Sequence, residues 1–282
     1  MTKKKKIIFA ICAAVLVALL VWGASESAAL VLTRYTVQSQ ELPKAFDGFR
    51  IAQVSDLHNT EFGKDNEKLL AMLREAQPDI IAITGDLYDS RNTNISIALA
   101  FAEQAMEIAP CYYVTGNHEN RSEEDYAQLK TGLLELGVVV LENEKVELHR
   151  DGASITICGI MDPSFEADYW RVMEEDVLNE HLPNLQSEGF TVLLSHRPEY
   201  MDLYAQYDFD LVLTGHVHGG QVRLPWIGGL YGPGQGMFPK YDAGLFAEGD
   251  TQMVVSRGIG NSVIPLRFNN RPEVVLITLN PQ

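Results

Sequence analysis

The chain has 282 residues, of which 46% are hydrophobic, and its formal net charge is -16. This length allows one large domain or two small ones, and the apolar content is sufficient for a substantial core. The acidic surface argues against a nuclease and against any nucleic-acid partner, so an anionic substrate would need a local positive charge such as a bound metal ion.

The amino terminus resembles a membrane anchor. Lys3–Lys6 precede an uncharged apolar run, Ile7–Gly23, whose 17 residues lie between the lengths of a signal peptide and a membrane-spanning helix. We expect residues 1–24 to form an uncleaved transmembrane anchor; a signal segment that is cleaved to give a secreted protein is the alternative. The lysines favour a cytoplasmic amino terminus, which makes this a single-pass protein of the cell membrane with an extracytoplasmic domain.

We expect a juxtamembrane stalk over residues 25–46, in which Ala29–Val37 has strand character, and a folded domain over residues 47–282. Strand and helix patterns alternate in the first half of this domain. The strands are Phe49–Ser55, Asp79–Thr84 and Cys111–Thr115, and the helices are Asn66–Ala76, Ile95–Ile108 and a third from Ser122 to about Leu136. This alternation is typical of a parallel sheet built from βαβ units.

The second half of the domain has more closely spaced strand patterns and one helix, Glu174–His181. The strands are Val138–Leu141, Lys145–His149, Ile155–Gly159, Thr191–Ser195, Asp210–Thr214, Gln252–Ser256 and Glu273–Leu279. Together the two halves predict an α/β fold with two packed sheets and helices outside. The stretch from Arg223 to Gly249 is rich in glycine, proline and aromatic residues, which predicts a long functional loop rather than disorder.

Five predicted strands are followed by side chains that could bind a metal ion. These side chains are Asp56, His58, Asp86, Asn117, His118, His196, His216 and His218. Parallel strands that share a sheet edge would bring them to one cleft. Each alone has an ordinary explanation, such as a turn or a core histidine. Together, carboxylates, imidazoles and an amide without thiolates favour Mn, Fe or Zn over an all-oxygen calcium or magnesium site. The cysteines Cys12, Cys111 and Cys158 have no metal-ligand spacing.

The ordered set of motifs resembles the calcineurin-like metallophosphoesterase superfamily from about Phe49 to Gln221. The motifs are Asp56-x-His58, Gly85-Asp86-x-x-Asp89, Gly116-Asn117-His118-Glu119, Ser195-His196 and Gly215-His216-x-His218. The extension Gly215-His216-Val217-His218-Gly219-Gly220-Gln221 further resembles the membrane-associated bacterial branch of that superfamily. The resemblance implies a two-sheet β-sandwich flanked by helices, preceded here by the transmembrane helix.

The resemblance also implies two divalent metal ions, Mn being favoured over Fe and Zn. One ion would be held by Asp56, His58, Asp86 and His218, and the other by Asp86, Asn117, His196 and His216. Asp86 would therefore be shared. By the same resemblance His118 would donate a proton to the leaving oxygen or stabilise the transition state, and Asp89 and Glu119 could orient ligand imidazoles.

The sequence therefore predicts a metal-dependent phosphoesterase acting on a phosphomonoester or phosphodiester. The anchor and the aromatic loop favour a lipid-linked or envelope phosphate, and a soluble phosphodiester is the rival substrate. A non-catalytic metal-binding scaffold of the envelope is the alternative function.

The sequence assigns no substrate-binding residue. Arg197 could bind the phosphate or pair with an acid. Tyr169 and Trp170 could cover the cleft, although packing is the favoured role for both. Arg257, Asn261 and Arg267 could contact substrate, although a surface or structural role is favoured for each.

Overall fold

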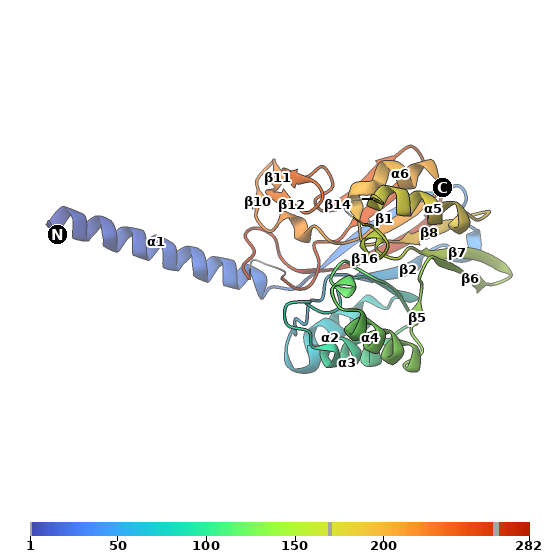
Figure 1. Ribbon diagram of the computed structural model, residues 1–282, viewed down its shortest axis with the longest axis horizontal. Helices are drawn as coiled ribbons and strands as arrows, with labels where there is room; N and C mark the ends of the chain where they lie inside the picture. Colours follow the sequence, from blue (N-terminus) through green and yellow to red (C-terminus); the bar gives the residue numbers. More distant parts are fainter. Residues whose placement is uncertain (1, 169–170, 262–264) are drawn as a thin grey trace.

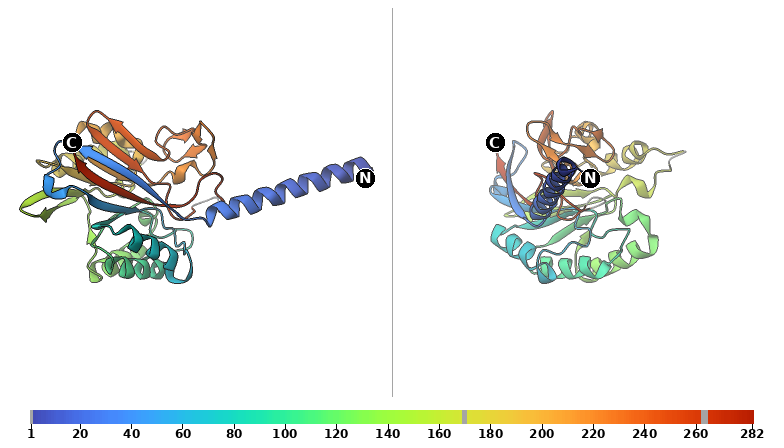
Figure 2. Two further views of the ribbon diagram at one scale, coloured as in Figure 1. Left: turned by 180° about the vertical axis from the view of Figure 1, so that it is seen from behind. Right: turned by 90° about the vertical axis from the view of Figure 1, so that its left-hand side faces the viewer.

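Two six-stranded sheets lie face to face at the centre of the molecule, and helices cover their outer faces (Figures 1 and 2). The computed structural model describes residues 2–168, 171–261 and 265–282. This arrangement of helix, sheet, sheet and helix layers confirms the predicted α/β sandwich.

The first sheet has the strand order β1-β16-β2-β3-β4-β5. Its strands are β1 (Val31–Ser39), β16 (Glu273–Pro281), β2 (Phe49–Val54), β3 (Ile80–Thr84), β4 (Cys111–Val114) and β5 (Val139–Val140). Strands β2 to β5 are parallel, whereas β16 is antiparallel to β2 and parallel to β1. Strand β3 is buried on both faces, which explains its uninterrupted apolar sequence.

Three helices cover the outer face of the first sheet, below it in Figure 1. They are α2 (Glu67–Ala76), α3 (Ile95–Met106) and α4 (Glu123–Glu135). Helix α2 turns Leu69, Leu70, Leu73 and Ala76 inward, as their helical spacing predicts. Helix α4 begins at Ser122, whose hydroxyl accepts a hydrogen bond from the Asp125 backbone N–H at 3.2 Å.

The second sheet has the order β14-β15-β9-β8-β7-β6. Its strands are β14 (Gly244–Glu248), β15 (Thr251–Val255), β9 (Leu211–Thr214), β8 (Thr191–Leu194), β7 (Ala153–Gly159) and β6 (Glu144–Arg150). The four central strands are parallel and the two edge strands are antiparallel to their neighbours. Helices α5 (Glu174–Leu185) and α6 (Met201–Gln206) pack on its outer face.

Apolar side chains from both sheets form the central layer of the core, including Ile51 and Val275 from the first sheet and Val192 and Leu213 from the second. Short 3-10 helices connect several elements. They are η1 (Lys44–Phe46), η2 (Lys64–Asn66), η3 (Glu119–Arg121), η4 (Pro163–Phe165), η5 (Pro198–Tyr200) and η6 (His218–Gly220). This buried layer fixes how the strand ends of the two sheets face one another.

Helix α1 (Lys3–Ser27) projects from one end of the domain (Figure 1). The predicted long loop forms two small hairpins and then edge strand β14. The hairpin strands are β10 (Arg223–Leu224), β11 (Gly228–Gly229), β12 (Tyr231–Gly232) and β13 (Gly236–Met237). In Figure 1 and in the left view of Figure 2 these hairpins lie at the same end of the domain as α1.

The predicted stalk of residues 25–46 differs from the structure. Strand β1 pairs with β16 along its whole length, and Val37, Leu42 and Phe46 are buried in the core between the sheets. The folded domain therefore begins at about Val31 rather than at residue 47. The partner strand lies about 240 residues away in the sequence, so local pattern alone did not place this segment in a sheet.

Replacement of Val37 tests this assignment. Val37→Ala removes two methyl groups from a side chain that is 1% exposed, and we expect the free energy of unfolding to fall by about 2 kcal/mol. The matched change Gln38→Ala, at an exposed neighbour in the same strand, should have little effect. Denaturant unfolding of both variants measures the difference, and equal midpoints would support a stalk instead.

Candidate metal centre

The predicted metal ligands meet where the carboxyl ends of the two sheets face one another. Asp56 and His58 follow β2, Asp86 follows β3, Asn117 follows β4, His196 follows β8, His216 follows β9, and His218 begins η6. All of them are buried except Asn117, which the structure also places at the cleft described below. The fold thus brings residues from both halves of the chain to one site.

Asp86 lies at the centre of this cluster. Its Oδ2 atom is 3.5 Å from His58 Nε2 and 3.2 Å from His196 Nε2, and these two imidazoles come from different sheets. Its Oδ1 atom accepts a hydrogen bond from the His118 backbone N–H at 2.9 Å. One carboxylate oxygen is therefore directed toward both halves of the cluster.

Two groups of donor atoms lie on either side of Asp86, and a third group with metal-ligand spacing joins His58, Asp86 and His118. In the first, His218 Nε2 lies 3.1 Å from His58 Nε2 and 3.3 Å from Asp56 Oδ1. In the second, His196 Nε2 lies 3.2 Å from His216 Nδ1. Ligands that bind one ion at about 2.0–2.2 Å lie about 3–3.5 Å apart, so each group has the spacing of a divalent-metal site.

An unsatisfied amide oxygen supports this assignment. Asn117 Oδ1 is buried and, within the described residues, accepts no hydrogen bond. A buried acceptor without a donor destabilises a fold unless another group satisfies it. A cation bound beside Asn117 would do so, and the residues present therefore fit a divalent metal.

Backbone carbonyls orient two of the ligand imidazoles. His196 Nδ1 donates to Thr84 O at 2.8 Å, and His218 Nδ1 donates to Gly260 O at 3.2 Å. Each bond leaves the Nε2 atom directed into the cluster. The fully buried Arg267 also donates to Gly260 O, so it supports the site from behind and has the structural role favoured for it from the sequence.

Glu119 differs from its expected role. Its carboxylate accepts hydrogen bonds from the backbone N–H groups of Asp86, Leu87 and Gly116 at 3.0, 2.8 and 2.8 Å. It therefore joins the ends of β3 and β4 and does not orient a ligand imidazole. Burial and the nearby Asp86 carboxylate raise the pKa of Glu119 to about 8.

Asp89 lies beside His118 and not beside a predicted ligand. Its carboxylate accepts a hydrogen bond from Arg91 Nε at 3.0 Å, and its Oδ1 is 3.6 Å from His118 Nδ1. The Ser90 backbone N–H donates to His118 Nδ1 at 3.1 Å. Because Nδ1 is the acceptor, the neutral His118 ring carries its hydrogen on Nε2.

Burial and charge set the protonation of the ligands. Burial lowers the pKa of His58 to about 4 and that of His218 to about 3, so both rings are neutral at pH 7. Burial also acts to lower the pKa of His196, but the Asp86 carboxylate outweighs it and raises that pKa to about 10. In the absence of metal His196 is therefore a cation paired with Asp86.

The backbone around the ligands is strained. Asp56, His58, Asp86, His216 and His218 all have left-handed φ values between 46° and 70°. Such conformations are uncommon for residues other than glycine and cluster at functional sites. A Cβ atom at Gly116 would lie 2.2 Å from Asp86 Oδ1, and one at Gly215 would lie 1.9 Å from Ser55 Oγ, so neither position has room for a side chain.

A cleft of about 720 Å³ opens beside Asn117 and His216. Its lining includes Asn120, Arg121, Ser164, Met173, Glu174, Arg197, Tyr200 and Pro233. The Arg197 guanidinium pairs with the buried Asp162 through contacts of 2.6 and 3.0 Å, as one of its two predicted roles requires, and its Nη1 lies 3.3 Å from His216 Nε2 at the cleft. The sequence reasoning missed Asp162, although it follows β7 just as the ligands follow their strands.

The remaining candidates lie outside the ligand cluster. The Arg257 guanidinium pairs with Glu273, and Asn261 Oδ1 accepts a hydrogen bond from Arg267 Nε at 2.9 Å, so both have structural partners. The predicted cover residues, Tyr169 and Trp170, lie outside the described part of the chain.

Comparison with known proteins connects this geometry to a family. The model of the calcineurin-like phosphoesterases matches residues 49–220, the region that contains every predicted ligand position. The metallophosphoesterase YkuE of Bacillus subtilis (strain 168) is 31% identical over 259 residues, a match that covers 88% of this chain and 84% of YkuE. Phosphodiesterase YaeI of Escherichia coli (strain K12) is 29% identical over 239 residues, which cover 82% of each chain.

A solved structure supports the fold. The sulfate thiohydrolase SoxB of Thermus thermophilus superposes with a TM-score of 0.51 at 14% identity, over 85% of this chain and 57% of SoxB. The chain belongs to the calcineurin-like phosphoesterase family and is a hydrolase of phosphoester bonds.

Proposed function

We propose that this protein is a membrane-anchored phosphoesterase that uses two divalent metal ions, with Asp86 as their shared ligand. The observation that carries the proposal is the position of Asp86 Oδ2 between His58 Nε2 and His196 Nε2. Asp56 and His218 would complete one ion's ligands, and Asn117 and His216 the other's. Manganese is the proposed metal, with iron and zinc as alternatives for this donor set.

Divalent ions bound by these residues would supply an activated water near neutral pH and would offset the negative charge of the phosphoryl oxygens. The chain's own residues would orient the ester and handle the proton. His118 lies next to the shared carboxylate, with its ring centre 4.5 Å from that of His58. Because Ser90 directs a hydrogen bond to Nδ1, the Nε2–H of His118 is the group available to protonate the leaving oxygen.

We further propose that the substrate is a lipid-linked phosphomonoester or phosphodiester of the cell envelope. Helix α1 is long and apolar enough to cross a membrane. The four lysines at its start favour a cytoplasmic amino terminus, which would place the metal centre outside the cytoplasm. A soluble phosphodiester is the competing substrate. A screen of lipid-linked and soluble phosphoesters, with the metal varied, would separate the two.

Replacement of the shared ligand tests the two-metal arrangement. Asp86→Ala should lose most of both ions and all phosphoesterase activity, because Asp86 Oδ2 lies 3.5 Å from His58 Nε2 in one group and 3.2 Å from His196 Nε2 in the other. His216→Ala and His218→Ala should each weaken mainly one ion. Elemental analysis and hydrolysis of bis-p-nitrophenyl phosphate measure these outcomes.

His149→Ala is the matched control, since this histidine is exposed on β6 and should change neither quantity. Full activity in Asp86→Ala would overturn the proposal. Bound metal in the unaltered protein without turnover of any phosphoester would instead support a metal-binding scaffold.

A second test concerns His118. His118→Gln should keep both ions, because the ring contributes no proposed ligand, and should slow turnover by about 10²–10⁴-fold. A general acid matters most when the leaving group is a poor one. The loss in kcat should therefore be larger for an alkyl phosphodiester than for a p-nitrophenyl ester. Equal losses on both esters would contradict proton donation by His118.

A third test follows from the raised pKa of His196. Its ordinary value of 6.5 is raised to about 10, so the metal-free protein holds a proton at pH 7 that a ligand nitrogen must lose. Metal binding should therefore release about one proton at pH 7, and apparent affinity should rise as the pH increases toward 10.

Calorimetric titration of the metal-free protein in buffers of different ionisation enthalpy measures this proton release. His196→Gln should release fewer protons than the unaltered protein. Release that is equal in the two proteins would show that the proton comes from another group.

A further inference from the structure

The segment of residues 224–238 has an unusual composition for this chain. Charged residues make up 21% of the protein, yet none occurs among these 15 residues. Within the described structure, five of the nine exposed large hydrophobic side chains outside α1 lie here. They are Trp226, Ile227, Tyr231, Met237 and Phe238, each more than half exposed. Clustered exposed apolar side chains of this kind mark an interaction surface.

This segment, which we call the apolar hairpins, begins beside the base of α1. The Trp22 ring packs edge-on against Phe268 with ring centres 5.5 Å apart. A Cβ atom at Gly23 would lie 2.8 Å from the same ring. Phe268 in turn pairs with Val222, and its carbonyl accepts a hydrogen bond from the Arg223 N–H at 3.0 Å. Phe268 therefore contacts both the end of α1 and the strand that leads into the first hairpin.

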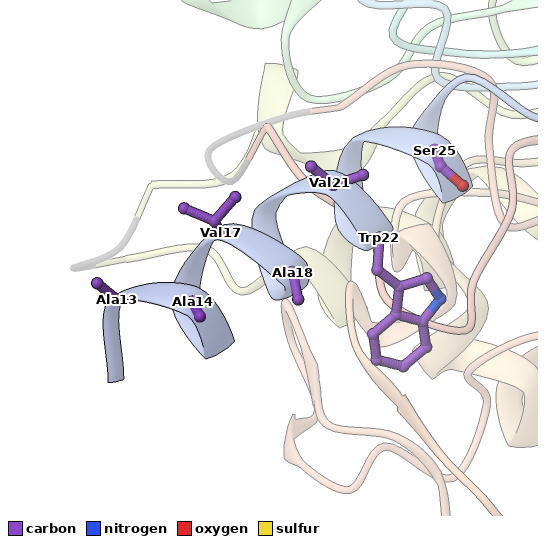
Figure 3. A pocket seen from close by; sticks show the side chains of 7 residues that line it. All are labelled: Ala13, Ala14, Val17, Ala18, Val21, Trp22 and Ser25. Atoms are coloured by element: carbon purple, nitrogen blue, oxygen red, sulfur yellow. The ribbon is translucent and has the colours of Figure 1, made fainter. Parts of the chain in front are cut away.

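The contact at Trp22 sets the height of this region relative to a bilayer. Trp22 belongs to the uncharged run Ile7–Gly23, which is about 25 Å long as a helix. A hydrocarbon core is about 30 Å thick, so Trp22 would lie at its outer boundary. Figure 3 shows Trp22 and the small residues along this face of α1. Two further contacts hold the helix end, one between Glu26 and Arg271 and one between Ser27 and Arg267.

We propose that the apolar hairpins insert into the interfacial layer of the same bilayer that α1 crosses, as a second membrane contact. The inference rests on the membrane anchoring in the proposed function and not on the catalytic activity. Trp226 and Tyr231 are amphipathic ring side chains of the type enriched at membrane interfaces. Arg223 and Lys240 flank the uncharged segment and would remain at headgroup level.

Strand polarity supports this orientation. Only three residues separate the end of α1 from the start of β1, and β1 runs away from the helix. Because β16 is parallel to β1 and antiparallel to β2, strands β2, β3 and β4 run back toward α1. Their carboxyl ends, which carry Asp56, Asp86 and Asn117, therefore lie at the end of the domain nearest the proposed membrane.

The apolar hairpins also pack directly on the metal centre. A Cβ atom at Gly220, two residues after His218 in η6, would lie 2.4 Å from Gly229 Cα. The Leu230 N–H donates to Val222 O at 2.8 Å, and Pro233 of the second hairpin lines the cleft. Insertion of the hairpins would thus hold the cleft at headgroup level, where a lipid phosphoester is presented.

Spin-label depth measurements test this proposal on the full chain in vesicles of phosphatidylcholine and phosphatidylglycerol. Native Cys12 reports on α1, while Cys111 and Cys158 are buried and remain unlabelled. In a Cys12→Ala background, Ile227→Cys reports on the hairpins. Ser154→Cys, at an exposed position of β7, is the matched aqueous control. Circular dichroism verifies that each variant is folded.

Oxygen partitions into lipid and a nickel chelate into water, so their relative collision rates give the depth of each label. We expect the labels at Cys12 and Ile227→Cys to favour oxygen and the label at Ser154→Cys to favour nickel. If the Ile227→Cys label matches the aqueous control while Cys12 lies in lipid, the second contact is overturned and the anchor stands. If the Cys12 label favours nickel, both the membrane anchor and the second membrane contact are overturned. Spin–spin broadening at Ile227→Cys that disappears on dilution with unlabelled protein would assign the hairpins to a second copy instead.

Discussion

The site depends on one constraint, which is that Asp86 must face His58 after a strand of the first sheet and His196 after a strand of the second at once. The apolar layer between the sheets meets this constraint, because Ile51, Val192 and their neighbours fix the separation of the strand ends. Gly116 and Gly215 then allow those ends to approach closely. A small shift of one sheet over the other would move His196 away from Asp86 and divide the cluster in two, so the packing of the core sets the geometry of the chemistry.

The close approach of the strand ends is accompanied by backbone strain at the proposed ligands. Five of the seven proposed ligands hold left-handed backbone conformations, each of which costs on the order of 1 kcal/mol for a residue other than glycine. Three backbone N–H groups donate hydrogen bonds to the Glu119 carboxylate, and the His216 N–H donates one to Asp56 Oδ1; these bonds hold the conformations in place. The free energy for this arrangement comes from burial elsewhere in the two sheets.

Sequence pattern was most informative where function imposes a local signature. A buried apolar run followed by glycine or serine and then a donor is readable in the chain, so Asp86, His196 and His216 could be predicted as neighbours. Other features depend on contacts between distant residues. Strand β1 has a half-exposed burial pattern and a partner at the far end of the chain, and the Asp162–Arg197 pair joins two strand ends that the sequence separates by 35 positions. Glu119 was predicted near the site, but its role depends on backbone direction, which side-chain type does not reveal.

The spread of the ligands along the chain has a consequence for folding. Asp56 and His218 are separated by 162 positions, and between them lie strands of both sheets. Neither half of the chain supplies all seven proposed ligands, so the complete two-ion centre would form only after both sheets have packed. Binding to the native state alone stabilises that state by mass action. A bound ion would therefore stabilise the completed fold rather than direct its formation. Metal depletion would lower the free energy of unfolding without changing the order in which the sheets form.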